Sequence, residues 1–233
     1  MQFDILSIFP EAFESYFQAS ILKRAQDAGH ISIQTHDVRV FTTDKHGKVD
    51  DTPYGGGAGM VMAVEPFDRA LQSIRAVPGT AGTRIILLSA KGRPFDQAKA
   101  RELAGCERLV LLCGRYEGVD ERVAEHLVDE ELSLGSFVLT GGELAAMIVV
   151  DAVARLLPGV LGNEESARGE SFADGENVEF PQYTKPETYR GWAVPSVLLS
   201  GHHAEIAAWR QAQSQYQTKQ RYETAIPVVP LPE

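Results

Sequence analysis

The stretch from Arg84 to Cys113, RIILLSAKGRPFDQAKARELAGCERLVLLC, contains two short apolar runs separated by a more polar segment. We expect strands at Arg84–Ser89 and Arg108–Cys113. Between them, a turn at Gly92 leads into a helix at Pro94–Leu103. Strands that are apolar on both faces and alternate with helices are typical of a parallel sheet covered by helices on both sides. The stretch therefore predicts an α/β fold.

Elements of the same two kinds flank this stretch. On the N-terminal side we expect strands and helices in alternation, at Gln2–Ile8, Pro10–Gly29, Ile31–Val38 and Glu65–Val77. On the C-terminal side we expect a helix, a third apolar strand and a long helix, at Val119–Leu127, Leu132–Leu139 and Glu143–Leu157.

Glycine-containing loops follow three of the expected strands, at Gly92, Gly114–Gly118 and Gly141-Gly142. Ligands of open α/β sheets bind beyond the carboxyl ends of the strands. We therefore expect the three loops to converge on one pocket. A further loop, Phe41–Gly59, is long enough to be either functional or disordered.

The apolar periodicity ends after Leu161. We predict three parts: an α/β domain at residues 1–161, a flexible acidic linker at 162–179 and a small, mainly helical domain at 180–233. In the last part, Glu187–Trp192 and Ser200–Tyr222 have helical patterns. About fifty-five residues are few for an independent core, so we expect this part to pack against the first domain or a second subunit.

The composition limits the class of protein. A hydrophobic fraction of 44% and a charged fraction of 23% are ordinary for a soluble globular protein. The longest segment without Lys, Arg, Asp or Glu, Gly191–Ala204, is too short to span a membrane, and the N-terminus has no signal-peptide pattern. The two cysteines, Cys106 and Cys113, are expected to be reduced thiols of a cytoplasmic protein.

The formal net charge of −10 does not exclude a nucleic-acid partner, because the charge is unevenly distributed. Residues 84–115 carry seven bases and three acids, whereas residues 117–131 and 164–179 together carry thirteen acids and two bases. Two acidic runs therefore account for the net charge, and a basic RNA-binding surface can exist elsewhere.

Motifs for several common chemistries are absent from the sequence. It contains neither the P-loop pattern nor a dinucleotide-binding G-x-G-x-x-G after a strand. No Cys or His pair has zinc spacing, and the adjacent His202 and His203 would point apart on a helix. Cys113 is expected to be a buried apolar residue. The sequence thus predicts no metal site and no cysteine nucleophile.

Five sequence strings, in order and at ordinary spacing, together indicate a family. They are DDTPYGGGAGM at Asp50–Met60, CGRYEG at Cys113–Gly118, VLTGGE at Val138–Glu143, PGVLGNEES at Pro158–Ser166 and LLSGHH at Leu198–His203. The chain resembles bacterial tRNA (guanine-N1)-methyltransferases, from Phe3 to about Arg210. Enzymes of this family methylate the guanosine immediately 3′ of the anticodon.

The resemblance implies a SPOUT-type α/β fold whose C-terminal part forms a deep trefoil knot. It also implies a homodimer that binds S-adenosylmethionine in the loops of the knot, between the two subunits. By position, the residues expected to bind this cofactor are Leu88, Ser89, Gly114, Tyr116, Glu117, Gly118, Ser133, Leu134, Gly135, Leu139, Gly141 and Gly142.

The implied macromolecular partner is tRNA, with neither DNA nor a membrane. We expect contacts with the anticodon arm in the C-terminal part, from Lys185, Arg190, His202, His203, Arg210, Lys219 and Arg221. The sequence does not say whether magnesium is required.

Guanine N1 is protonated at neutral pH, so its methylation needs a general base. The resemblance assigns this role to Asp174 and assigns to Arg155 the stabilisation of negative charge on guanine O6. An aspartate has a reference pKa of about 3.9, so it is a weak base unless burial raises that pKa. From the helix pattern alone, an i,i+4 ion pair with Asp151 is the simpler role for Arg155; the resemblance favours the catalytic one.

Two segments depart from the family pattern. Ser89-Ala90-Lys91-Gly92 stands where Ser-Pro-Gln-Gly is commoner. After Ser133, Leu134-Gly135-Ser136-Phe137 stands where Ile-Gly-Asp-Tyr is commoner. These changes bear on cofactor geometry and affinity rather than on the class of enzyme.

Two other functions are the alternatives. The first is a SPOUT enzyme acting on ribosomal RNA, against which the loop Phe41–Gly59 and the segment around Asp174 argue. The second is an RNA-binding or assembly protein without catalysis, against which the presence of Asp174 and Arg155 argues.

Overall fold

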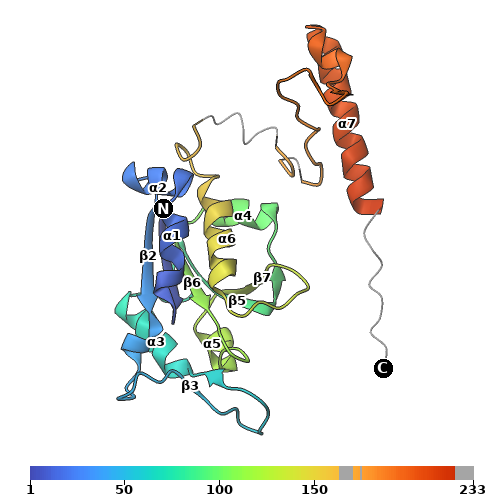
Figure 1. Ribbon diagram of the computed structural model, residues 1–233. Helices are drawn as coiled ribbons and strands as arrows, with labels where there is room; N and C mark the ends of the chain where they lie inside the picture. The colour runs from blue at the N-terminus through green and yellow to red at the C-terminus, as the bar shows by residue number, and fades with distance from the viewer. Residues whose placement is uncertain (163–169, 174, 224–233) are drawn as a thin grey trace, which may run out of the picture. The chain divides into compact units, whose positions relative to one another are not determined.

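The computed structural model describes residues 1–162, 170–173 and 175–223. The chain divides into two compact units, residues 1–164 and 165–233. The N-terminal unit contains the large sheet, and the C-terminal unit contains a hairpin and a long helix (Figure 1). The domain and linker boundaries predicted from the sequence stay predictions.

A five-stranded parallel sheet forms the centre of the N-terminal unit, in the order β2-β1-β6-β5-β7 (Figure 1). Its strands are β1 Gln2–Ser7, β2 Ser32–Asp37, β5 Thr83–Pro94, β6 Arg108–Cys113 and β7 Glu130–Ser133. In the middle of the sheet, Leu111 of β6 pairs with Ile5 of β1 and Ile86 of β5. The predicted α/β class with a parallel sheet is confirmed.

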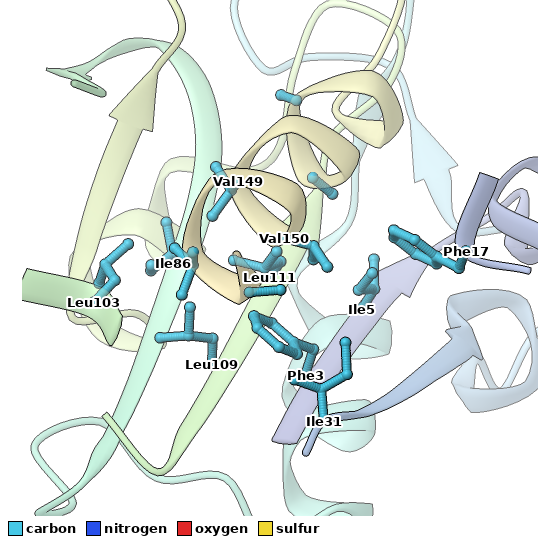
Figure 2. Packing of buried hydrophobic residues seen from close by; sticks show 14 of the residues in the cluster. Phe3, Ile5, Phe17, Ile31, Ile86, Leu103, Leu109, Leu111, Val149 and Val150 are labelled. Carbon is cyan, nitrogen blue, oxygen red and sulfur yellow. The ribbon is translucent and has the colours of Figure 1, made fainter. Parts of the chain in front are cut away.

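One face of the sheet packs against α6 (Glu143–Ala154). Figure 2 shows Val149 and Val150 of this helix above Leu109 and Leu111 of the sheet. The same apolar cluster includes residues of the helices α1 Glu14–Phe17, α2 Ser20–Asp27 and α4 Gln97–Ala104. Among the described residues, no helix is both long enough and apolar enough to cross a membrane.

The opposite face packs against α3 (Val64–Ser73), α5 (Glu121–His126) and the 3-10 helix η2 (Val38–Phe41). Leu112 of β6 and Phe67 of α3 are both fully buried in this second cluster. Because side chains alternate along a strand, the continuous apolar run of β6 supplies residues to both clusters. Each fully buried Leu, Ile or Phe side chain contributes roughly 1.5–3 kcal/mol.

The single helix predicted between Pro10 and Gly29 is wrong. The chain forms a 3-10 helix η1 at Pro10–Phe13, then α1, and then α2 after a break. Ser20, the first residue of α2, has a φ of 46°, so the backbone turns out of the α-helical path between α1 and α2. The side chain of Gln26 donates a hydrogen bond to the carbonyl of Phe17 at 2.8 Å, which satisfies one acceptor left free there.

Strand β5 is longer than predicted, and the turn expected at Gly92 is wrong. The strand continues to Pro94 with an irregularity between Leu88 and Arg93, and α4 begins only at Gln97. A Cβ at Gly92 would lie 2.5 Å from the backbone nitrogen of Leu132, so two backbones pass each other closely here. The strand predicted at Leu132–Leu139 is also largely wrong. Strand β7 begins earlier, at Glu130, and the chain leaves the sheet after Ser133.

The loop Phe41–Gly59 has a defined course. It contains the strand β3 (Asp50–Asp51), which pairs antiparallel with β4 (Val61–Met62). Among the glycines that follow β3, Gly57 has a φ of 127°, in the region that favours glycine.

In the C-terminal unit, α7 (His203–Glu223) confirms the predicted helix, whereas the helix predicted at Glu187–Trp192 is wrong. That segment is a hairpin of β8 (Thr188–Tyr189) and β9 (Trp192–Ala193), followed by the 3-10 helix η4 (Ser196–Leu199). Arg190 and Gly191 have φ values of 54° and 83°, as a two-residue hairpin turn requires.

Part of the segment predicted as a flexible linker is bound to α7. Ser214 donates a hydrogen bond to the carbonyl of Val178 at 2.6 Å, and the Val178 amide donates to the hydroxyl of Thr218 at 3.0 Å. Nearer the start of the segment, the guanidinium of Arg221 lies 5.1 Å from the ring centre of Phe172. The end of the predicted linker therefore belongs to the C-terminal unit.

A buried charge cluster joins three strands at the start of β6. The carboxylate of Asp4, which is 1% exposed, accepts a hydrogen bond from Arg108 at 2.8 Å and lies 2.7 Å from Nε2 of His36. Burial raises the pKa of the Asp4 carboxyl, but the hydrogen bonds from His36 and Arg108 outweigh burial and hold that pKa below its usual value.

We expect Asp4→Asn to lower the free energy of unfolding at neutral pH by about 3–5 kcal/mol, the usual cost of removing one member of a buried ion pair. Because the folded-state pKa of Asp4 is lowered, its stabilisation is complete above the unfolded-state value of about 3.9 and is lost as the pH falls through the folded-state value. Urea unfolding followed by circular dichroism should therefore show a smaller difference between variant and wild type at about pH 3 than at about pH 7.

Asp27→Asn is the control, because Asp27 forms an exposed i,i+4 pair with Lys23. This variant should change the free energy of unfolding by no more than about 0.5 kcal/mol. A loss for Asp4→Asn that is equal at both pH values would contradict the role assigned to its carboxylate.

Candidate functional site

A cavity of about 430 Å³ lies beyond the carboxyl ends of β6 and β7 and beside β5 where its pairing with β6 ends, at Leu88. Its size is in the range of small-molecule sites. Two of the three expected glycine-containing loops, Gly114–Gly118 and Gly141-Gly142, meet at this cavity, as their positions after parallel strands predict. Gly92 lies within β5 and does not line the cavity. Eleven of the twelve residues expected to bind the cofactor line it: Leu88, Ser89, Gly114, Tyr116, Glu117, Gly118, Ser133, Leu134, Leu139, Gly141 and Gly142.

Gly135 is the expected residue that does not line the cavity. It has a φ of 149°, and a Cβ added there would lie 2.9 Å from the ring of Phe137, which does line the cavity. Gly135 therefore affects the cavity indirectly, because it lets the loop bring the ring of Phe137 into the cavity lining. The binding roles of all twelve residues stay predictions.

The loop between β6 and α5 forms one wall. In this loop Tyr116 has a φ of 60°, unusual for a residue with a side chain. The amide of Glu117 donates to the carbonyl of Met60 at 3.0 Å, and the amide of Met62 donates to the carbonyl of Gly118 at 2.9 Å. These bonds connect the end of the glycine-rich loop to the cavity wall.

The start of α6 is held directly against the end of β6. The amide of Gly142 donates to the carbonyl of Gly114 at 2.9 Å. A Cβ at Gly142 would lie only 2.7 Å from the Cα of Cys113, so the approach of the two backbones requires glycine.

Charged side chains of both signs line the cavity. Lys91 donates to Glu121 at 2.5 Å, and this hydrogen bond raises the pKa of Lys91. The cavity is also lined by Glu117, Glu131 and Arg115. The lysine that departs from the family pattern therefore pairs with α5 across the cavity wall.

The environment of Cys113 does not suit a nucleophile. Cys113 is fully buried, and burial raises the pKa of its thiol well above the usual value, so it stays protonated. Within residues 1–162, 170–173 and 175–223, no group of three or more His, Cys, Asp and Glu side chains is arranged to hold a metal ion.

Of the two predicted catalytic residues, the structure describes only Arg155. Arg155 is half-buried at the C-terminal end of α6 and does not line it. The carboxylate of Asp151, the alternative partner of Arg155, accepts a hydrogen bond from the hydroxyl of Tyr16 at 2.8 Å. Asp174 lies outside the described residues.

The comparisons identify the family. The model of the family described as tRNA (Guanine-1)-methyltransferase TrmD matches residues 1–226. The chain belongs to this family. A tRNA (guanine-N(1)-)-methyltransferase of Heliobacterium modesticaldum is 53% identical over 235 residues, which cover 100% of this chain and 87% of the relative. Those of Geotalea uraniireducens and Chloroflexus aggregans are each 56% identical, over 92% and 91% of this chain and 85% and 82% of their own lengths.

The prediction of a methyltransferase of this family is thus confirmed, but the sequence analysis did not identify every residue around the cavity. Arg115 and Thr140 line the cavity and occur within the motifs Cys113–Gly118 and Val138–Glu143, so membership of these motifs could have indicated that they lie at the site. Val61 and Glu131 also line the cavity but lie outside those motifs.

We expect Gly142→Ala to destabilise the N-terminal unit by about 1–3 kcal/mol or more, the usual cost of overpacking, and to abolish methyl transfer. The reason is steric, because the added methyl group would meet the backbone of Cys113 at 2.7 Å. Thermal unfolding and a methyl-transfer assay measure the two effects. Gly162→Ala is the matched control, because a Cβ at Gly162 would meet no atom within 4 Å. A Gly142→Ala enzyme with wild-type melting temperature and activity would show that the close approach is not needed.

Proposed function

We propose that this protein transfers a methyl group from S-adenosylmethionine to N1 of the guanosine immediately 3′ of the anticodon in tRNA. The observation that carries the proposal is the cavity itself. Loops carrying two of the family's sequence motifs, Cys113–Gly118 and Val138–Glu143, surround it in a chain that matches the family over residues 1–226.

The residues around the cavity fit this cofactor. S-adenosylmethionine supplies an electrophilic methyl group when bound. Leu88, Leu134 and Leu139 offer apolar surface, and the glycines let backbone groups approach closely. Glu117 and Glu131 add negative charge, which suits a ligand with a sulfonium and an ammonium group.

Proton removal from guanine N1 is assigned to Asp174. A positioned general base is worth roughly 10²–10⁴-fold in rate. The residues around it are anchored, since the amide of Phe172 donates to the carbonyl of Asn177 at 2.6 Å and Val178 is bound to α7. Docking of tRNA on the C-terminal unit would therefore deliver the segment that carries the base.

Arg155 is assigned the role of stabilising the negative charge that develops on guanine O6, which is worth about 10²–10³-fold in rate. At 1.5 Å per residue the twelve residues of α6 span about 18 Å, and the cavity lies at the opposite end of the helix from Arg155. This separation supports a homodimer in which the arginine of one copy serves the cavity of the other. Leu144 and Ile148, on the same helix, are 57% and 48% exposed and offer an apolar contact surface.

The C-terminal unit is the proposed tRNA-binding part. Its bases lie beside aromatic side chains that can also stack on RNA: the guanidinium of Arg210 lies 4.8 Å from the ring centre of Phe180, and that of Arg190 lies 5.3 Å from the ring centre of Tyr189. We also infer a cytoplasmic location, because the two cysteines are free thiols.

We further propose that the chain forms the trefoil knot of SPOUT enzymes. Strand β7 lies at the edge of the sheet, yet the chain returns past β5 to the end of β6 before entering α6. The close approach of Gly92 to Leu132 supports a tight crossing at this place.

A methyl-transfer assay with two tRNA transcripts tests the function. The transcripts are identical except that the nucleotide 3′ of the anticodon is guanosine in one and adenosine in the other. We expect labelled methyl groups only on the first, because only guanine presents the N1 proton that the base removes. Equal labelling of both would contradict the proposal. If neither transcript is labelled, the protein is better explained as an RNA-binding protein without catalysis. If ribosomal RNA is labelled instead, the alternative SPOUT activity is favoured.

We expect Asp174→Asn to bind S-adenosylmethionine as the wild type does but to transfer its methyl group roughly 10²–10⁴-fold more slowly in a single turnover. The amide keeps the shape of the side chain but cannot accept the N1 proton. Glu176→Gln is the control, because it removes a carboxylate from the same acidic segment and should keep its rate. A normal single-turnover rate for Asp174→Asn would refute the assignment.

A further inference from the structure

A buried carboxylate lies beneath the cavity wall. Glu143, the first residue of α6, is 3% exposed. Its Oε1 accepts a hydrogen bond from the Ser7 hydroxyl at 2.7 Å, and its Oε2 accepts one from Nε of Arg115 at 2.9 Å. Both carboxylate oxygens are therefore engaged, by side chains from two distant parts of the sequence.

Arg115 is held on further sides. Its Nη1 donates to the carbonyl of Thr140 at 3.3 Å, and its guanidinium lies 4.7 Å from the ring centre of Phe9. Its backbone amide lies 3.2 Å from the sulfur of Met62. The side chain thus contacts the segment after β1 and the loop before α6, and the backbone amide contacts β4.

A stabilising role alone does not account for the Arg115–Glu143 ion pair. Taking two charges out of water costs several kcal/mol per ion, and apolar residues of similar volume often stabilise a fold as well or better. Two hydrogen-bonded oxygens on a rigid helix end do, however, fix where the guanidinium lies. The arrangement favours a role in geometry.

The segment whose geometry depends on Arg115 is the cavity wall itself. Tyr116 follows directly, with a φ of 60° and 54% exposure. A residue with a side chain in this conformation costs of order 1–3 kcal/mol and persists only where its surroundings enforce it. Arg115 lines the cavity, whereas Glu143 is not among its lining residues.

We propose that Glu143 is a positioning residue: through Arg115 it fixes the wall Arg115–Gly118 in the conformation that binds the cofactor, without touching the cofactor. The inference rests on the proposed function, because it takes the ligand of this cavity to be S-adenosylmethionine. Ser7 contributes in two ways. Its hydroxyl donates a hydrogen bond to Oε1 of Glu143, and it accepts a hydrogen bond from the Phe9 amide at 2.9 Å. The second bond holds the segment whose Phe9 ring lies against the guanidinium of Arg115.

Glu143→Gln tests the proposal. The glutamine side chain has nearly the volume of glutamate but carries no charge. Its NH₂ group would face either the Ser7 hydroxyl or the Arg115 guanidinium in place of a carboxylate oxygen. We expect the dissociation constant of S-adenosylmethionine, measured by calorimetry, to rise about 10- to 100-fold, as loss of a hydrogen bond between charged groups predicts. At saturating cofactor, kcat should return close to the wild-type value and the KM for tRNA should be unchanged, because neither the base nor the tRNA-binding part is altered.

Asp4→Asn is the matched control. It breaks a buried carboxylate–arginine pair of the same kind, with Arg108, at the other end of β6. Both variants should lose stability, and both are compared at a temperature at which circular dichroism shows them folded. Only Glu143→Gln should lose cofactor affinity.

Ser7→Ala is a milder variant should Glu143→Gln fail to fold. It removes one hydrogen bond from Glu143 and should raise the dissociation constant about two- to tenfold. Wild-type affinity in folded Glu143→Gln, or in Ser7→Ala when that is the variant that folds, would overturn the proposal, as would an equal loss in Asp4→Asn. Wild-type protein that neither binds S-adenosylmethionine nor methylates tRNA would instead overturn the proposed function.

Discussion

The structure depends on the burial of β6 between two layers of helices. Every residue from Leu109 to Cys113 is fully buried, and the strand has parallel neighbours on both sides. With both faces of the sheet covered, the strand ends are where a small molecule can reach the backbone. The cavity at the carboxyl ends of β6 and β7, beside the middle of β5, is therefore a consequence of the sheet, and the loops there carry two of the family's motifs.

The sequence could predict this frame because the frame depends on local patterns. The apolar run of β6 gave its bounds without error, and the alternation of strands and helices indicated the parallel sheet. The strand-end rule correctly predicted that the loops Gly114–Gly118 and Gly141-Gly142 lie at one pocket, but not that Gly92 lies within β5. The identity of the cofactor and the roles of Asp174 and Arg155 came only from the resemblance, since no spacing in the chain specifies them.

The errors have different causes, and only one of them reflects a contact between residues distant in the sequence. Strand β5 passes through Gly92 because the chain runs against Leu132, forty residues away in the sequence. The helix after Pro10 breaks where Gln26 can satisfy the carbonyl of Phe17. The hairpin at Arg190-Gly191 is different: a glycine between aromatic residues is a local hairpin indication, which the helical pattern of Glu187–Trp192 obscured.

The two buried ion pairs explain how apolar packing acquires a fixed register. Burial of apolar surface is non-directional, whereas hydrogen bonds and ion pairs act only at particular positions along the strand. Arg108 begins the strand and pairs with Asp4 of β1, while Arg115 lies two residues beyond its end and pairs with Glu143 of α6. Because Ser7 of β1 also bonds Glu143, β1 contributes to both ends. A shift of β6 would break its backbone pairing with β1 and β5 and, at the same time, the charged hydrogen bonds at its two ends, so polar contacts add to apolar packing in holding the strand in register.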